Sequence, residues 1–270
     1  MRQKRPIEDY PFFDIDGPVA VAHRGGTAAG LGTENTLEAI ESAVADGLNV
    51  IETDTVKTAD DISVIFHGSE DLPKGLRNGY PTSDEIQRMT YREAIRKLGR
   101  PLLRTEELLD SFPDLKVFID PKTDEAVGPL AEAIKNQKAE NRVNVGSFRY
   151  RRTQRIAELL GHQISTSFFK YRKIQVHQPG LTLSRAMNRN GFNTLQIPHD
   201  LIGAAEVERY KDMGLWVIAW AKMGPKGDPR KYDTLEYIAA VPAKGFDGLI
   251  SDHTKELSSL KKRLRRLTPQ

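Results

Sequence analysis

The sequence predicts one α/β domain, residues 1–270, folded as a closed (β/α)8 barrel. Short apolar segments alternate with amphipathic helical segments along most of the chain, and eight such strands can be counted. The length of 270 residues suits one barrel, and no shift in composition divides the chain. The expected strands are VAVAHR, NVIETD, KVFIDP, VNVGSF, ISTSFF, NTLQIP, LWVIAW and DGLISD.

The first strand, helix and strand form the best-defined unit. In ENTLEAIESAVADG, Asn35 is the expected helix N-cap, Glu38 completes a capping box and Gly47 ends the helix. Leu37 and Ile40 lie on the face that covers the strands. The unit is a βαβ motif, which predicts parallel strands and a right-handed crossover.

The next segment departs from the alternation. A turn at Asp60-Asp61 is too short to hold a helix, so ISVIFH is expected to return as a hairpin strand, inside or outside the barrel wall. A small insertion, about residues 69–104, follows the strand that ends at His67. It contains a polar helical stretch from about Ser83 to Lys97.

The rest of the chain returns to the barrel pattern. Helices are expected at RTEELLDSF, DEAVGPLAEAIKNQK, RTQRIAELLG, AAEVERYKDMG and TLEYIAAVPAKG. The last segment, about 255–267, predicts a basic amphipathic helix with leucines at helical spacing. Such a helix either closes the barrel or makes weak contact with an anionic membrane surface.

Composition excludes several classes of protein. The absence of cysteine excludes disulfides, thiolate metal sites and a cysteine nucleophile, and it fits a cytoplasmic location. A net charge of +3 is too small to indicate a nucleic-acid binder. We expect no secretory signal, because acids and prolines follow the charged N-terminus in place of an apolar core. We expect no transmembrane segment, because no apolar run is long enough to span a membrane. Composition does not indicate an oligomeric state.

Polar residues at strand ends are the candidates for chemistry, because the strand ends of such a barrel converge on one mouth. Glu52 and Asp54 are two residues apart on one strand and therefore point the same way. Two carboxylates aimed together favour a bound divalent cation. His23 and His67 end strands on either side of this pair. Further candidates at strand ends are Asp120, Lys122, Trp220, Lys222, Ser251 and Asp252.

These motifs resemble the glycerophosphodiester phosphodiesterase family. The family pattern stands here as His23-Arg24-Gly25, Glu34-Asn35-Thr36, Glu52-Thr53-Asp54 and His67, and the resemblance extends to about residue 252. It implies metal-dependent hydrolysis of a small-molecule glycerophosphodiester to glycerol phosphate and an alcohol. In that family the insertion lines the alcohol side of the substrate; a surface excursion is the alternative.

Residue chemistry and the resemblance together predict roles for eight residues. Glu52, Asp54 and Asp120 are the expected ligands of Mg²⁺ or Ca²⁺, which prefer oxygen ligands. Histidine suits proton transfer near neutral pH, and the resemblance implies His23 as base and His67 as acid. Arg24 and Lys122 are expected to contact phosphate, and Trp220 to contact the substrate.

Departures from the family pattern leave alternatives open. Asp120 stands where the family usually has glutamate, Gly68 where it commonly has aspartate, and Ala221-Lys222-Met223 where it has Thr-Val-Asn. Lys122 could instead pair with Asp120 or Glu52, and Trp220 could belong to the core. A phospholipase D-like enzyme acting on lysophospholipid or sphingomyelin, and a barrel that binds phosphorylated ligands without turnover, are the rival functions.

Overall fold

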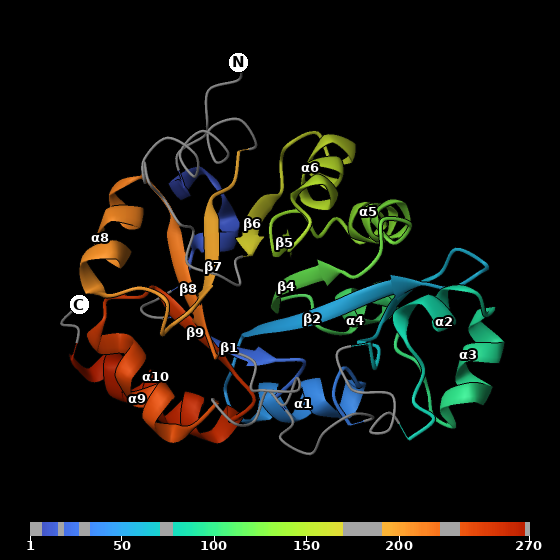
Figure 1. The fold of residues 1–270 in the computed structure, drawn as a ribbon, viewed down its shortest axis with the longest axis horizontal. Coiled ribbons are helices and arrows are strands. Elements are labelled where there is room, and N and C mark those ends of the chain that lie inside the picture. Colours follow the sequence, from blue (N-terminus) through green and yellow to red (C-terminus); the bar gives the residue numbers. More distant parts are fainter. Residues whose placement is uncertain are drawn as a thin grey trace.

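The structure is a computed structural model that describes residues 7–15, 19–26, 33–70, 78–169, 191–221 and 233–267. Lys222 lies outside the described residues. The expected barrel is confirmed, because neighbouring wall strands are parallel and β1 pairs with both β9 and β2 to close the ring (Figure 1). The wall strands are β1 (Val19–His23), β2 (Val50–Lys57), β4 (Lys116–Pro121), β5 (Val143–Ser147), β6 (Ser165–Phe169), β7 (Thr194–Pro198), β8 (Trp216–Trp220) and β9 (Gly248–Ser251).

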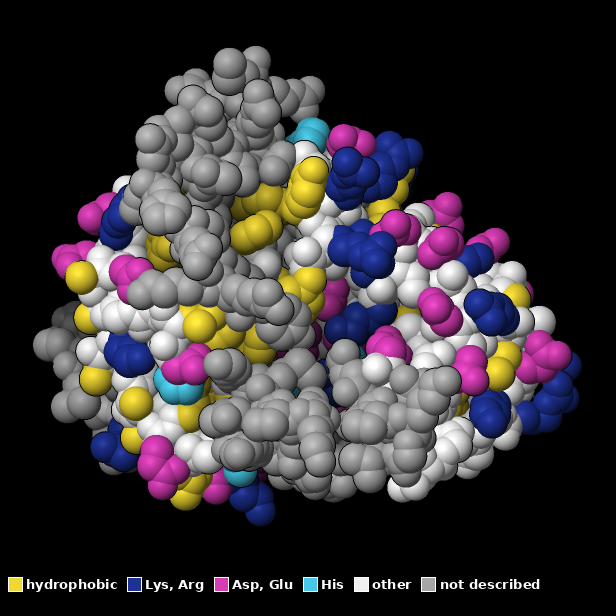
Figure 2. Space-filling model, in the orientation of Figure 1, with side chains coloured by type: hydrophobic (Ala, Val, Ile, Leu, Met, Phe, Trp, Pro, Cys, Tyr) yellow, Lys and Arg dark blue, Asp and Glu magenta, His cyan; other side chains and the backbone are white. Residues whose placement is uncertain are grey.

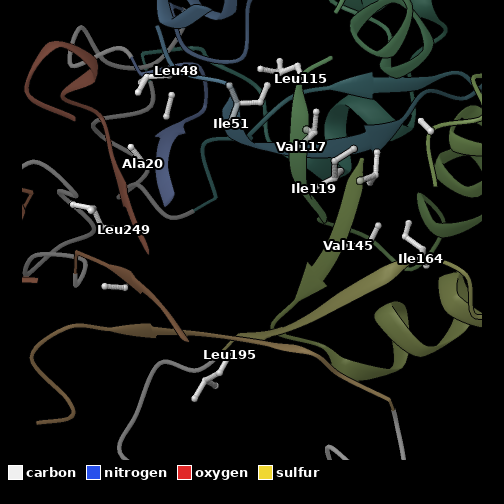
Figure 3. Close-up of a cluster of buried hydrophobic side chains, with 14 of the residues drawn as sticks. Ala20, Leu48, Ile51, Leu115, Val117, Ile119, Val145, Ile164, Leu195 and Leu249 are labelled. Atoms are coloured by element: carbon white, nitrogen blue, oxygen red, sulfur yellow. The ribbon is translucent and has the colours of Figure 1, made fainter. Parts of the chain in front are cut away.

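Helices surround the barrel and cover the outer faces of its strands (Figure 1). Outward side chains such as Ile51, Val117 and Leu195 pack with the helices in one large apolar cluster (Figure 3). Because side chains alternate along a strand, the inward positions remain for the barrel interior and the site. The helices are α1 (Leu37–Ala45), α4 (Thr105–Ser111), α5 (Val127–Asn136), α6 (Tyr150–Leu159), α8 (Ala204–Asp212), α9 (Leu235–Ala243) and α10 (Thr254–Leu267).

An N-terminal segment closes one end of the barrel. It contains two short 3-10 helices, η1 (Ile7–Asp9) and η2 (Pro11–Phe13). Phe12 is 1% exposed, and its ring lies 4.9 Å from that of Phe118 inside the barrel. Phe13 packs against Trp216 at 4.6 Å. Aromatic rings from the segment therefore fill the interior at the amino ends of the strands.

The strand β3 (Ser63–Ile65) lies outside the barrel wall. It pairs antiparallel with the last residues of β2, Thr55 to Lys57, whereas the wall neighbours of β2 are β1 and β4. The hairpin expected at Asp60-Asp61 is present, and Asp61 has a positive φ of 59°. His67 therefore reaches the barrel mouth from a hairpin that extends past the wall.

The described part of the insertion contains two helices, so the helical stretch expected from about Ser83 to Lys97 is interrupted at residues 88–90. The helices are α2 (Ser83–Gln87) and α3 (Tyr91–Leu98), which lie at one side of the molecule (Figure 1). Thr82 and Thr90 each form a capping box with the glutamate three residues later. The second box starts a new helix, because Thr90 has extended backbone and its side chain accepts from the new helix.

Asn35 is not the N-cap of α1, contrary to expectation. The helix begins one residue later, and Thr36 Oγ1 accepts a hydrogen bond from the Ala39 amide at 3.2 Å. Asn35 has a positive φ of 56°, and its side chain is used elsewhere. Asparagine adopts this conformation more readily than most residues do.

The described part of α10 packs on the barrel. Leu257 is fully buried, Leu260 lies against the main core, and Lys261 Nζ donates to Asn49 Oδ1 at 2.6 Å. These two leucines therefore pack against the barrel core of the same chain. Over the residues that the structure describes, every helix is too short or too polar to cross a bilayer.

Candidate active site

All eight residues predicted for the site line one pocket at the carboxyl ends of the barrel strands. They are His23, Arg24, Glu52, Asp54, His67, Asp120, Lys122 and Trp220. β1, β2, β4 and β8 contribute most of them, and His67 follows β3. The His67 side chain is buried at the pocket wall. Strand ends and one hairpin thus bring distant parts of the chain to one place.

Asp54 is the centre of an ion-pair network. Its Oδ1 lies 2.7 Å from Lys122 Nζ, and its Oδ2 lies 3.0 Å from Arg24 Nε. Lys122 Nζ also lies 3.0 Å from Asp120 Oδ2, because Asp54 and Asp120 are register partners on β2 and β4. Burial would raise the pKa of Asp54, but the Lys122 and Arg24 cations outweigh burial and hold it well below its usual range. Lys122 therefore forms the salt bridge to Asp120 that the sequence left open.

Glu52 and Asp120 differ from Asp54 because one oxygen of each carboxylate has no hydrogen-bond donor in the described part of the chain to balance its charge. Glu52 Oε2 and Asp120 Oδ1 are buried without a hydrogen-bond partner among the described residues. Burial, with the nearby Asp54 anion, raises the pKa of Glu52 to about 7, and burial also raises the pKa of Asp120. Such oxygens are costly to bury as anions unless a cation accompanies them.

These carboxylates suit a hard divalent cation in their chemistry. The donors are oxygen atoms, two of them without a donor partner. Within the described ranges no three His, Asp or Glu side chains are grouped closely enough to form a metal site. Lys122 Nζ, which lies between Asp54 and Asp120, already supplies positive charge there.

His23 is paired with Asp252, a strand-end candidate that the sequence analysis did not include among the eight site residues. His23 Nδ1 lies 2.8 Å from Asp252 Oδ1, and its Nε2 lies 3.8 Å from Glu52 Oε2. Burial lowers the pKa of His23, but the Asp252 carboxylate opposes burial and the net effect raises that pKa to about 9. Asp233 in turn accepts hydrogen bonds from Ser251 Oγ at 2.7 Å and the Asp252 amide at 2.6 Å.

Asn35 supports the site through two buried hydrogen bonds. Thr53 Oγ1 donates to Asn35 Oδ1 at 2.6 Å, and Asn35 Nδ2 donates to Asp54 Oδ2 at 3.3 Å. Glu34 beside it accepts from Arg24 Nη1 at 2.9 Å. The Glu-Asn-Thr motif thus orients an arginine and a carboxylate of the site. Its position in the family pattern was the signal that could have found these roles.

The departure at Gly68 has a steric explanation. A Cβ on Gly68 would lie 2.0 Å from Glu70 Oε2 and 2.3 Å from the Ser83 amide nitrogen. Glu70 Oε2 accepts from that same amide at 3.1 Å. A carboxylate therefore lies beside residue 68, but Glu70 supplies it, and it accepts hydrogen bonds at the start of α2.

The opposite side of the pocket is largely apolar. Phe148, Phe169 and Trp220 line it, together with Gln196 and Ile250. Hydrophobic side chains gather left of centre on this face and Lys and Arg side chains to the right (Figure 2). Sequence reasoning missed Phe148, Phe169 and Gln196, because nothing local distinguishes them from core residues.

The comparison with protein families agrees with this site. A model described as the glycerophosphoryl diester phosphodiesterase family matches residues 23–256. The chain belongs to this family. Members of the family generally use a divalent cation. Both histidines and all three carboxylates of the predicted site fall inside the matched residues.

A curated relative of the family is the probable glycerophosphodiester phosphodiesterase 2 of Mycobacterium tuberculosis. It is 35% identical over 160 residues, which span 58% of this chain and 58% of the relative. The match thus leaves a large part of that protein uncovered.

Solved structures share the fold of this chain. A putative glycerophosphoryl diester phosphodiesterase from Silicibacter pomeroyi DSS-3 has 18% identity and a TM-score of 0.74, with 95% of this chain and 98% of that one covered. A phosphodiesterase from Oleispira antarctica in complex with the product sn-glycerol-3-phosphate has 17% identity and a TM-score of 0.71, with 91% and 97% covered.

Proposed function

We propose that this protein hydrolyses glycerophosphodiesters to glycerol phosphate and an alcohol, in a reaction that depends on a divalent cation. The observation that carries the proposal is one pocket that combines the His23–Asp252 pair, His67 and the three carboxylates beside Arg24 and Lys122. Family membership supports the same conclusion, and so does the product bound to the Oleispira antarctica neighbour.

Two cationic side chains prepare the pocket for phosphate. Arg24 and Lys122 are partly buried beside Asp54, which keeps both in place and charged. Charge on a phosphodiester rises as its phosphorus is attacked, so fixed positive charge stabilises that transition state. Glu52, Asp54 and Asp120 would have to move closer together to hold Mg²⁺ or Ca²⁺, which would polarise a phosphoryl oxygen and lower the pKa of the nearby His23.

The two histidines divide the proton transfers. In the loaded pocket His23 accepts a proton from the water whose oxygen attacks phosphorus as the P–O bond to the alcohol breaks. Asp252 holds the His23 ring by Nδ1, so that Nε2 faces the carboxylate cluster. His67 donates a proton to the departing alcohol. In the free pocket His23 is protonated at neutral pH, because its pKa is raised to about 9.

Turnover of glycerophosphocholine tests the proposal. Chelator-treated protein is supplied with Mg²⁺, Ca²⁺ or Mn²⁺, and glycerol phosphate is measured. We expect cation-dependent release, with losses of at least about 10²-fold in kcat for His23→Ala and for His67→Ala. Full activity of His23→Ala would refute the assignment of the base.

Two other outcomes identify the rival functions. Hydrolysis of lysophosphatidylcholine in place of glycerophosphocholine would indicate a phospholipase D-like enzyme. Binding of glycerol phosphate without turnover in any of the three cations would indicate a non-catalytic barrel.

A further inference from the structure

Gln196 is a buried amide at the floor of the apolar side of the pocket. It lies on β7, is 3% exposed, and lines the pocket. Its register partners are Phe169 on β6 and Ile218 on β8. Trp220 pairs with Pro198, two residues further along the strands, so Gln196 lies deeper in the barrel than Trp220. The catalytic groups described above do not use this residue.

A chain of hydrogen bonds orients the amide. Gln196 Nε2 donates to Ser167 Oγ at 3.1 Å, and Ser167 Oγ donates to Asn144 Oδ1. Asn144 Nδ2 donates to Thr194 Oγ1 at 3.2 Å. All four side chains are buried. Because Ser167 engages the nitrogen of this pocket-lining side chain, Oε1 is the polar atom of Gln196 that remains for a ligand, and none of the described residues donates to that oxygen.

An aromatic wall faces the same space, made of Phe148, Phe169 and Trp220. The Phe148 ring lies 5.2 Å from Phe169 and 6.1 Å from Trp220, both edge to face. Gly146 makes room for the wall, because a Cβ there would lie 2.2 Å from Phe169 Cε1. Gly146 on β5 thus leaves the space that the Phe169 ring of β6 occupies.

One hydrogen-bond acceptor below an apolar wall suits a small alcohol with C–H faces and a hydroxyl group. The charged side of the pocket suits the phosphate, so the alcohol portion next to the phosphate lies toward the wall. Only the part of a substrate that enters deepest reaches Gln196. The three-carbon glycerol is small enough to do so, whereas a choline head group has no hydroxyl to donate.

We infer that Gln196 is a specificity-determining residue that accepts a hydrogen bond from a hydroxyl of the glycerol portion of the substrate. The inference rests on the proposed function and adds to it the means by which the pocket selects glycerol. A site that pairs a buried acceptor with a substrate hydroxyl discriminates against compounds that lack the hydroxyl, because the acceptor is then left unpaired.

The test compares Gln196→Met with the native protein on three phosphodiesters. Glycerophosphocholine has hydroxyls only on glycerol, glycerophosphoinositol also has them on the head group, and bis(4-nitrophenyl) phosphate has none. We expect kcat/KM to fall about tenfold, the effect of one lost hydrogen bond, on the first two substrates and to stay within about twofold on the third.

Other results overturn the inference. Equal losses of kcat/KM on all three substrates would show a structural role for Gln196. A loss on glycerophosphoinositol alone would show that Gln196 contacts the head group. No loss on any substrate would show that it contacts neither the glycerol portion nor the head group. Native protein that cleaves only bis(4-nitrophenyl) phosphate would refute the proposed function itself. If Gln196→Met does not fold, Ser167→Ala frees the amide, and we expect about a threefold loss on the glycerol substrates alone.

Discussion

At the scale of single residues, the site depends on side chains that act through their neighbours. Asp252 sets the orientation and charge of His23, and Asn35 holds Asp54 and Thr53 in place. Asp252 follows the last residue of a barrel strand, whereas Asn35 precedes a helix. Both are buried or partly buried polar groups whose loss leaves another polar group unpaired.

Asp252→Asn should lower the pKa of His23, because it removes the anion that favours the imidazolium. The raised pKa of His23 stabilises the native fold. This stabilisation is fully present at pH values below 6.5, the pKa of the unfolded state, and it is lost as the pH rises through about 9. Urea unfolding of chelator-treated protein should therefore show native protein more stable than the variant at about pH 6, with a smaller gap at about pH 10. A gap that stays constant between these pH values would contradict the pairing.

Asn35→Ala should reduce both stability and activity. Thr53 Oγ1 and Asp54 Oδ2 each lose a buried partner, which costs roughly 1–3 kcal/mol of unfolding free energy. Thr36→Ala is the matched control, because it removes the helix cap next door and costs about 1 kcal/mol without touching Asp54. Denaturant titration and kcat measure the two effects. Equal kcat values for both variants would refute a role for Asn35 in the site.

At the scale of elements, the β2–β3 hairpin positions His67 at the barrel mouth, although β3 is not one of the wall strands. β3 pairs with residues of β2 beyond those that pair with β1, and the chain after His67 is held against the start of α2. Glu70 makes that connection through the Ser83 amide and hydroxyl. The position of His67 thus depends on close packing between the hairpin and the insertion.

Gly68→Ala should disturb this packing. The added Cβ meets Glu70 and the Ser83 backbone at distances that require a shift, so we expect a loss of about 1–3 kcal/mol in unfolding free energy. Activity should fall as well, since His67 is adjacent. Gly128→Ala in α5 is the control, because no atom lies within 4 Å of its added Cβ and alanine favours a helix. A Gly68→Ala protein as stable as Gly128→Ala would contradict the close contact.

At the scale of the whole molecule, much of the architecture could be predicted because barrel strands are short apolar runs. All eight wall strands were expected, and the polar residues that end them meet at one pocket. The helix break at Thr90 was missed, since helical periodicity continues across it while the capping box acts locally. Gln196, Asp233 and Phe148 were missed because their roles come from contacts across the barrel, which no sequence spacing encodes.

The two ends of the barrel should respond differently to loss of an aromatic ring. Phe12 fills the interior at the amino ends of the strands, so Phe12→Ala should cost about 3–5 kcal/mol of unfolding free energy and leave KM unchanged at low temperature. Phe148 is 39% exposed at the mouth, so Phe148→Ala should leave stability nearly intact and raise KM for glycerophosphocholine. Thermal unfolding and steady-state kinetics on both variants check this. A raised KM in Phe12→Ala would mean that the interior transmits strain from the closed end to the pocket, and that the barrel does not separate stability from function.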